Sequence, residues 1–235
     1  MVPLQFFLLT SVGIDPGLAL MVSFGTSLAI IIPTSISGAY KHNKELNNIL
    51  KPGITLGLFG IIGGALGGIL ASYAPTRILQ VFFSIILIII AINMLLNKET
   101  GKSEAKIKFN IYSAAVIGVG VGILSGLLGI GGGVFIVSIL SIILGFSLIE
   151  SIGISSIFIS LTSIGGVSSY ILTGLNVNTI PYSLGYVNLI NFFVIILFSI
   201  PCAYIGANLS HKLPERRLQQ IFAILIIILA IKMII

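Results

Sequence analysis

Long apolar runs separated by short polar loops make up almost the entire chain. A helix rises about 1.5 Å per residue, so a run of about 20 apolar residues can cross the ~30 Å hydrocarbon core of a bilayer. We predict membrane segments in the first half at residues 18–40, 53–73 and 78–96, and in the second half at 111–128, 148–172, 184–209 and 218–235.

Two apolar runs, at residues 2–12 and 134–144, are too short to cross the bilayer untilted, because a helix of that length rises only about 16 Å. We predict that both are half-helices. The helix starts are indicated by Asp15-Pro16, an N-cap followed by proline at the first helical position, and by the capping box Ser147-x-x-Glu150.

The chain contains an internal repeat. The segment that begins at Pro75 recurs at Pro214, 139 residues later. Earlier in each half, Gly25 recurs as Gly153 and the pair Thr34-Ser35 recurs as Thr162-Ser163, in both cases 128 residues later. We therefore predict a first transmembrane repeat at residues 1–97, a cytoplasmic linker at 98–109 and a second transmembrane repeat at 110–235, within one integral membrane domain.

Basic residues indicate how the two copies are oriented, because short cytoplasmic loops collect lysine and arginine. Loop 41–51 holds three lysines, whereas its counterpart, 174–183, holds no charge. The turn around Pro75 has one basic residue, whereas the turn at 212–217 has three. Matching loops are therefore expected on opposite sides of the membrane. The prediction is an all-α, polytopic transmembrane bundle of two inverted-topology repeats with broken or re-entrant half-helices, a construction found in many secondary transporters.

Composition strengthens the assignment to the membrane. Of the 235 residues, 57% are apolar and only 8% are charged, whereas soluble domains have about 25% charged residues. This excludes a soluble enzyme, a nucleic-acid binder and a disordered tail. The net charge of +6 belongs to the predicted cytoplasmic loops, and the single cysteine, Cys202, excludes a disulfide framework. With no cleavable signal peptide visible, the first helix is expected to direct insertion.

A glycine run, Gly129-Ile130-Gly131-Gly132-Gly133, lies at hydrocarbon depth just before the second half-helix. Non-helical backbone at that depth must be buried in protein or line an aqueous cavity. The half-helix would then direct its free N–H groups and the positive end of its dipole into the bundle, which suits an anion. Gly131, Gly132 and Gly133 are therefore candidate binding residues, and close helix packing is the alternative explanation of the glycines.

Hydroxyl side chains cluster in matching segments of the two repeats. One by one, such residues usually bond to the preceding helical turn or join neighbouring helices. Two related polar segments that meet at a pseudo-two-fold axis would instead form a polar cavity without fixed charge. A pair of asparagines, expected three residues apart on one helix face, has the same two explanations. The candidates are Thr26, Ser27, Thr34, Ser35, Ser155, Thr162, Ser163, Asn188 and Asn191.

The ionisable residues do not form a cluster at mid-membrane depth. Asp15 and Glu150 are expected helix caps, His42 and His211 lie at loop edges, and Lys232 is close to the last residue. A proton relay, a metal site and an intramembrane protease dyad all lack the residues they need. We therefore expect neither an enzyme nor a bound cofactor or metal.

The motif Gly126-Leu-Leu-Gly-Ile-Gly-Gly-Gly133, together with Gly25-Thr-Ser-Leu28 and Pro33-Thr-Ser35, resembles the sulfite exporter TauE/SafE family of membrane permeases over essentially the whole chain. The resemblance implies a multi-pass transporter of the plasma (cell) membrane that carries sulfur-containing oxyanions, with the glycine motif and the Thr-Ser segments in the roles given above. It also implies a glycine-rich helix in both halves, whereas Val2-Pro3 corresponds to the point just after that motif.

We predict a permease that transports, and in this family exports, small sulfur-containing oxyanions such as sulfite or organosulfonates by alternating access. A passive anion channel could use the same residues, and a non-transporting membrane scaffold subunit is the third hypothesis. The expected partners are a small anionic substrate and the lipid bilayer, with a second copy of the chain as a further candidate and no nucleic acid.

Overall fold

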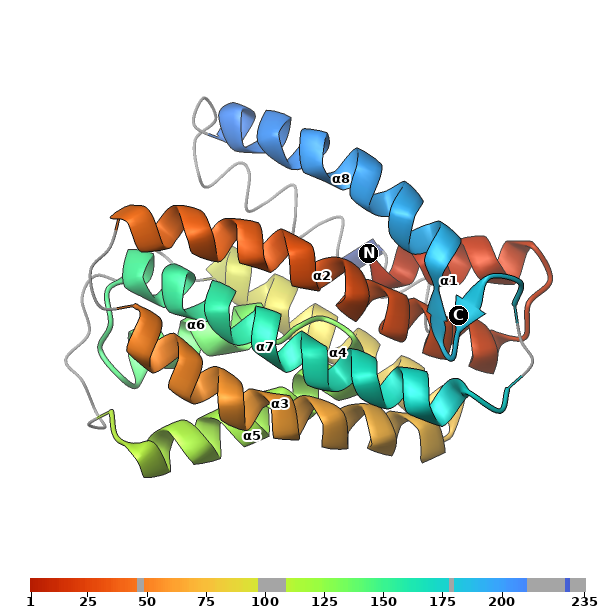
Figure 1. The fold of residues 1–235 in the computed structure, drawn as a ribbon, viewed down its shortest axis with the longest axis horizontal. Coiled ribbons are helices and arrows are strands. Elements are labelled where there is room, and N and C mark those ends of the chain that lie inside the picture. Colours follow the sequence, from red (N-terminus) through yellow and green to blue (C-terminus); the bar gives the residue numbers. More distant parts are fainter. Residues whose placement is uncertain (46–48, 97–108, 178–179, 211–226, 229–235) are drawn as a thin grey trace. The chain divides into compact units, whose positions relative to one another are not determined.

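A computed structural model describes residues 1–45, 49–96, 109–177, 180–210 and 227–228. These residues are almost entirely helical (Figure 1). The elements in chain order are α1 (Val2–Ser11), α2 (Pro16–Glu45), α3 (Leu50–Tyr73), α4 (Thr76–Leu96), α5 (Ile111–Leu128), α6 (Gly133–Ile142), α7 (Leu148–Gly174), β1 (Ser183–Leu184), β2 (Val187–Asn188) and α8 (Leu189–Ser210). The all-α fold class predicted from the apolar pattern is confirmed.

The predicted helix starts are formed by the expected side chains. Asp15 Oδ1 accepts hydrogen bonds from the N–H groups of Gly17 and Leu18 at 2.9 and 3.1 Å. At the start of α7, the Ser147 hydroxyl accepts from the Glu150 N–H, and the Glu150 carboxylate accepts from the Ser147 N–H at 2.9 Å. These bonds satisfy N–H groups that would otherwise lack partners at the helix ends.

Four of the described helices are long and apolar enough to cross a membrane: α2, α3, α5 and α7. Helices α1 and α6 have 10 residues each and rise only about 15 Å, as expected for half-helices. Most of the predicted segment at 218–235 and most of the predicted linker at 98–109 lie outside the described residues.

The predicted helix at 184–209 starts later than expected. Residues 183–188 form a short antiparallel hairpin in which Ser183 pairs with Asn188, and the helix begins only at Leu189. Gly185, at φ +57°, makes the turn, and this backbone conformation favours glycine. The prediction that Asn188 and Asn191 share one helix face is therefore wrong, because Asn188 precedes the helix.

The helices divide into two compact units. The first contains residues 1–73 and 101–192, and therefore α1, α2, α3, α5, α6, α7 and the hairpin. The second contains residues 74–100 and 193–235, and therefore α4 and most of α8. In the first unit, α3 packs against both α5 and α7, α2 packs against α7, and the half-helices α1 and α6 pack against α2 and α7 respectively (Figure 1).

Glycines allow α3 and α5 to approach closely. A Cβ atom added at Gly122 of α5 would lie 2.8 Å from the Gly60 carbonyl oxygen and 3.0 Å from Gly63 Cα. One added at Gly118 would lie 2.7 Å from the carbonyl oxygen of Leu56, one turn earlier on α3. Both helices therefore run in the same direction, with backbone against backbone. Small residues at such crossings are typical of membrane helix pairs.

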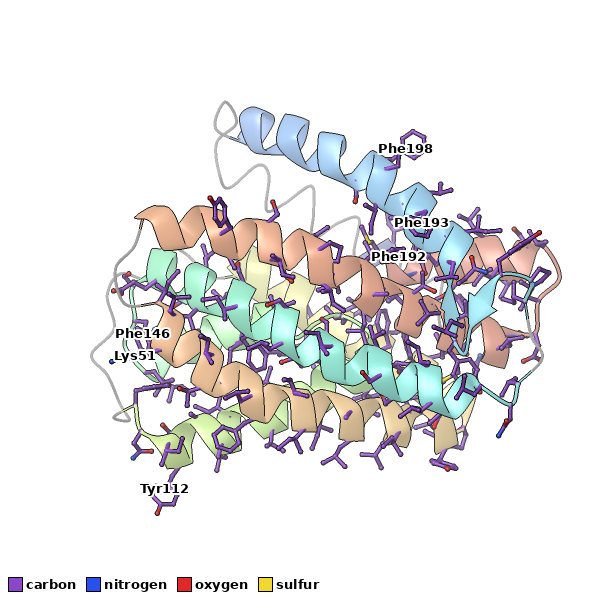
Figure 2. The ribbon with its side chains drawn as sticks, in the orientation of Figure 1. Lys51, Tyr112, Phe146, Phe192, Phe193 and Phe198 are labelled. Carbon is purple, nitrogen blue, oxygen red and sulfur yellow. The ribbon has the colours of Figure 1, made fainter. Side chains whose placement is uncertain are left out.

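One end of this unit carries the side chains expected at a membrane surface. Figure 2 shows Lys51 and Tyr112 at the same end, near the starts of α3 and α5, and both side chains are exposed. Phe146 lies at this end too, where its ring stacks edge to face on Phe109 with centroids 6.0 Å apart. Lysine and tyrosine are typical of the boundary between hydrocarbon and water.

Candidate functional site

The glycine run forms a break between α5 and α6 in the interior of the first unit. Gly129 ends α5 in the left-handed conformation at φ +64°, and Gly132 precedes α6 at φ +74°. A Cβ atom at Gly129 would lie 2.7 Å from Phe24 Cα of α2. Gly131 and Gly132 are buried. The backbone turns here, inside the helical unit, because glycine tolerates both the positive φ and the close contact.

The break is surrounded by three helices. A Cβ atom at Gly131 would lie 2.9 Å from Ile159 of α7 and 3.3 Å from Ile31 of α2, and one at Gly133 would lie 2.7 Å from Ile159. A Cβ atom at Gly132 would meet α5, at 3.0 Å from Val121 Cγ1 and 3.2 Å from Ser125 Cβ. The start of α6 is therefore enclosed by α2, α5 and α7.

The first N–H groups of α6 are the polar groups that this break provides. The Gly132 carbonyl accepts the first helical hydrogen bond, from Ile136. The N–H groups of the residues between them have no acceptor within the helix, and the helix dipole places partial positive charge there. No side chain caps this helix. The arrangement suits an anion.

Two of the predicted hydroxyls on α7 lie in the interior without a partner. Thr162 and Ser163 have no exposed surface, and neither hydroxyl has a hydrogen-bond partner within the described residues. The Thr162 side chain lies against α3, because its Oγ1 occupies the space that a Cβ at Gly60 would need. Buried polar groups usually have partners, so these two hydroxyls are available for a ligand.

Other predicted hydroxyls bond to their own helix. Thr34 Oγ1 donates to the Ile31 carbonyl at 2.9 Å, and Ser35 Oγ donates to the same oxygen at 2.7 Å. Ser155 Oγ donates to the Ile152 carbonyl at 2.8 Å. Such bonds to the preceding turn are the ordinary state of helical hydroxyls. Ser27 is also buried on α2, with 2% of its surface exposed.

Thr26 and the two asparagines form a separate structural cluster. The Asn188 N–H donates to Thr26 Oγ1 at 3.0 Å and joins the hairpin to α2. Asn188 Oδ1 accepts from the Asn191 N–H at 2.9 Å and so caps α8, while its Nδ2 donates to the Ser183 hydroxyl. The structure therefore brings Thr26 and Asn188 together, in contacts that hold the hairpin.

Sequence reasoning missed Ser125. This serine lies in the last turn of α5, beside Gly132, with 1% of its surface exposed, and its hydroxyl has no partner among the described residues. Its position one helical turn before Gly129, where α5 ends at the glycine break, could have pointed to it.

Comparisons with known proteins place this chain in a family. The family model for the sulfite exporter TauE/SafE matches residues 1–233. A probable membrane transporter protein of Haemophilus influenzae is 31% identical over 99% of this chain and 88% of its own. No solved structure matches the chain.

Two further relatives carry similar names. The probable membrane transporter protein YdhB of Bacillus subtilis is 32% identical over 82% of this chain and 76% of its own. The probable membrane transporter protein MJ0441 of Methanocaldococcus jannaschii is 32% identical over 92% of this chain and 79% of its own. The resemblance identified from the glycine and Thr-Ser motifs is confirmed, and this multi-pass membrane protein, a transporter of the permease type, belongs to the sulfite exporter TauE/SafE family.

Proposed function

We propose that this protein exports small sulfur-containing oxyanions, such as sulfite or organosulfonates, across the plasma membrane. The observation that carries the proposal is the start of α6 inside the helical unit, where free N–H groups are enclosed by α2, α5 and α7. An anion at that position replaces lost hydration with aligned N–H donors. The name of the family model supports sulfite as the substrate.

Buried neutral hydroxyls supply further donors. Thr162 and Ser163, both buried and without partners in the described part of the chain, lie on α7, the helix that also contacts the glycine break through Ile159. We propose Gly131, Gly132 and Gly133 with Thr162 and Ser163 as the main substrate-binding residues. Thr34 and Ser35 are the repeat counterparts on α2. They would also bind the anion in a conformational state in which their hydroxyls donate to the anion and no longer to carbonyls of the preceding turn.

We further propose that transport occurs by alternating access between inverted repeats. The directions of α2 and α7 support this, since these predicted repeat counterparts run antiparallel (Figure 1). A Cβ at Gly38 of α2 would lie 3.6 Å from Ser156 Oγ, and one at Gly166 of α7 would lie 2.7 Å from Leu28 Cδ1. Each α2 residue lies 128 positions before the α7 residue of the other contact. The repeat relationship therefore maps each contact onto the other, which is the behaviour of contacts across a two-fold axis.

The position of the glycine break fits the same proposed two-fold axis. Ile31 and Ile159, which flank Gly131, are also 128 residues apart in the sequence. In transporters built from inverted repeats, the substrate site lies near the midplane at the repeat interface and involves interrupted helices. The position of Gly131 between two equivalent isoleucines agrees with that pattern.

The function is tested by flux of radiolabelled sulfite from proteoliposomes that contain the purified protein. We expect efflux that saturates with sulfite concentration and competes with organosulfonates. Flux that rises linearly with concentration and carries current would instead indicate a passive anion channel. Flux no greater than in protein-free liposomes would contradict transport and favour a scaffold subunit.

The inverted topology predicts that matching loops label from opposite sides of the membrane. Cysteines at Asn43 and at Asn176, in a background in which Cys202 is replaced by alanine, should react with an impermeant maleimide from the cytoplasmic and the outer side, respectively. Both asparagines are neutral, so the substitutions leave the charge bias of the loops intact. Labelling of both positions from one side would contradict the inverted arrangement.

A further inference from the structure

Ser125 lies beside the first turn of α6 although it belongs to α5. A Cβ atom added at Gly132, the residue immediately before α6, would lie 3.2 Å from Ser125 Cβ. Helical side chains tilt toward the start of their own helix. The Ser125 side chain therefore projects from the last turn of α5 back toward Val121. The Cγ1 atom of Val121 would lie 3.0 Å from the same added Cβ at Gly132.

The buried hydroxyls of the described helices fall into two groups. Some donate to a carbonyl of the preceding turn, and five have no partner among the described residues: those of Ser84, Ser125, Ser151, Thr162 and Ser163. Ser23, which is also fully buried, donates to the Ala19 carbonyl at 2.6 Å, and Ser169 donates to the Gly166 carbonyl at 2.7 Å. Ser125 Oγ is buried and makes no such bond. A buried hydroxyl without a partner destabilises the fold by about 1–3 kcal/mol, so such a group calls for a partner outside the described chain, either a water molecule or a ligand.

The neighbouring polar groups of α5 are already occupied. The Ser125 carbonyl accepts the Gly129 N–H at 3.0 Å, and the Gly126 carbonyl accepts the Tyr170 hydroxyl at 2.9 Å. The Ser125 hydroxyl is therefore the side-chain donor that α5 has available at this point. The first N–H groups of α6, which have no acceptor within their own helix, are the other donors there. Ser125 and the first turn of α6 therefore lie side by side, and each offers hydrogen-bond donors.

We infer that Ser125 Oγ and the first N–H groups of α6 together bind one singly charged sulfur oxyanion, either hydrogen sulfite or an organosulfonate. This inference rests on the proposed function and names the charge class of its substrate. An oxyanion has several acceptor oxygens that point in different directions. One oxygen accepts from the α6 backbone while another accepts from Ser125.

The charge class follows from the neutrality of the donors. Among the residues whose side chains the structure describes, the buried polar ones are Gln, Ser, Thr and Asn, with no Asp, Glu, Lys or Arg. The free energy of removing an ion from water grows with the square of its charge, whereas its interaction with fixed dipoles grows only linearly. Neutral donors can therefore compensate for one negative charge far better than for two.

The test measures binding and transport separately. Isothermal titration of the purified full chain with methanesulfonate, which is singly charged, and with sulfate, which is doubly charged and of similar size, gives the affinity for each charge class. We expect methanesulfonate to bind at least about tenfold more tightly than sulfate. Equal affinities, or tighter binding of sulfate, would overturn the assignment of charge.

Ser125→Ala tests the hydroxyl. Loss of one hydrogen bond to a charged ligand should weaken methanesulfonate binding about tenfold to a hundredfold. Because the hydroxyl has no partner among the residues that the structure describes, the melting temperature should stay the same or rise. Ser23→Ala, which removes a buried hydroxyl that does have a partner, should leave the affinity unchanged. An unchanged affinity in Ser125→Ala would overturn the role of Ser125.

The two proposals fail in different ways. Methanesulfonate binding that depends on Ser125, without sulfite flux in proteoliposomes, would contradict the transport function but support the binding site. Saturable sulfite flux with the same apparent KM in Ser125→Ala and in the unmodified protein would support transport and contradict the site.

Discussion

Gly132→Ala should lower sulfite flux at subsaturating concentration at least about tenfold while the protein still inserts and folds. The added Cβ would lie 3.0 Å from Val121 Cγ1 and 3.2 Å from Ser125 Cβ, between the start of α6 and the last turns of α5. An anion that cannot contact both sets of donors loses at least one hydrogen bond to a charged group, which corresponds to about tenfold to a hundredfold in affinity. Initial rates of efflux from proteoliposomes measure the effect.

Gly13→Ala is the matched control. Gly132 has φ +74° and Gly13 has φ +90°, so alanine is strained at both positions by about 1–2 kcal/mol. A Cβ at Gly13, however, has no atom within 4 Å. Both variants should therefore melt at a lower temperature, and Gly13→Ala should transport normally. If Gly132→Ala also transports normally, the glycines serve close packing and the anion binds elsewhere.

The apolar pattern predicted most of the fold because each membrane helix is long, apolar and bounded by local signals. The caps at Asp15 and Ser147 formed as expected, since a capping bond joins residues two or three apart in sequence. The hairpin before α8 was missed because its apolar residues, Leu184 and Val187, lead almost directly into the apolar run of the helix. Gly185 and Asn188 were the available signals there, as a turn glycine and an N-cap.

The candidate site was harder to predict because it depends on which polar groups remain without partners. Ser35 and Ser163 occupy equivalent positions in the two repeats. Ser35 nevertheless donates to the Ile31 carbonyl, whereas Ser163 has no partner among the described residues. Thr26 accepts a bond from Asn188, 162 residues away. Rotamers and long-range contacts decide these outcomes, and neither leaves a local signature in the sequence.

The glycines therefore have two distinct physical roles that look alike in the sequence. At Gly129 and Gly132, glycine adopts a positive φ where α2 and α5 leave no room for a side chain, and the chain can therefore turn inside the bundle. At Gly118 and Gly122, the backbone is an ordinary helix, and the absence of a side chain sets the distance to α3. Substitutions at the first group should affect anion binding, and substitutions at the second should affect folding.

Gly122→Leu should destabilise the protein by about 3 kcal/mol, the upper part of the usual range for overpacking. A Cβ at Gly122 would meet the Gly60 carbonyl oxygen at 2.8 Å, Gly63 Cα at 3.0 Å and the Gly64 nitrogen at 3.1 Å. All three are backbone atoms, which cannot move away by changing a rotamer. The leucine must therefore push α5 away from α3 and break the contact along its length. The fraction of protein that stays monodisperse on size-exclusion chromatography after heating measures the loss.

Gly120→Leu provides the comparison within the same helix. A Cβ at Gly120 has no atom within 4 Å, and the residue is exposed. Leucine is the better helix former by close to 1 kcal/mol, so this variant should melt at the same temperature as the unmodified protein or higher. Equal melting temperatures for Gly120→Leu and Gly122→Leu would mean that α5 can move away from α3 without cost. The close backbone contact would then not be what holds these helices together.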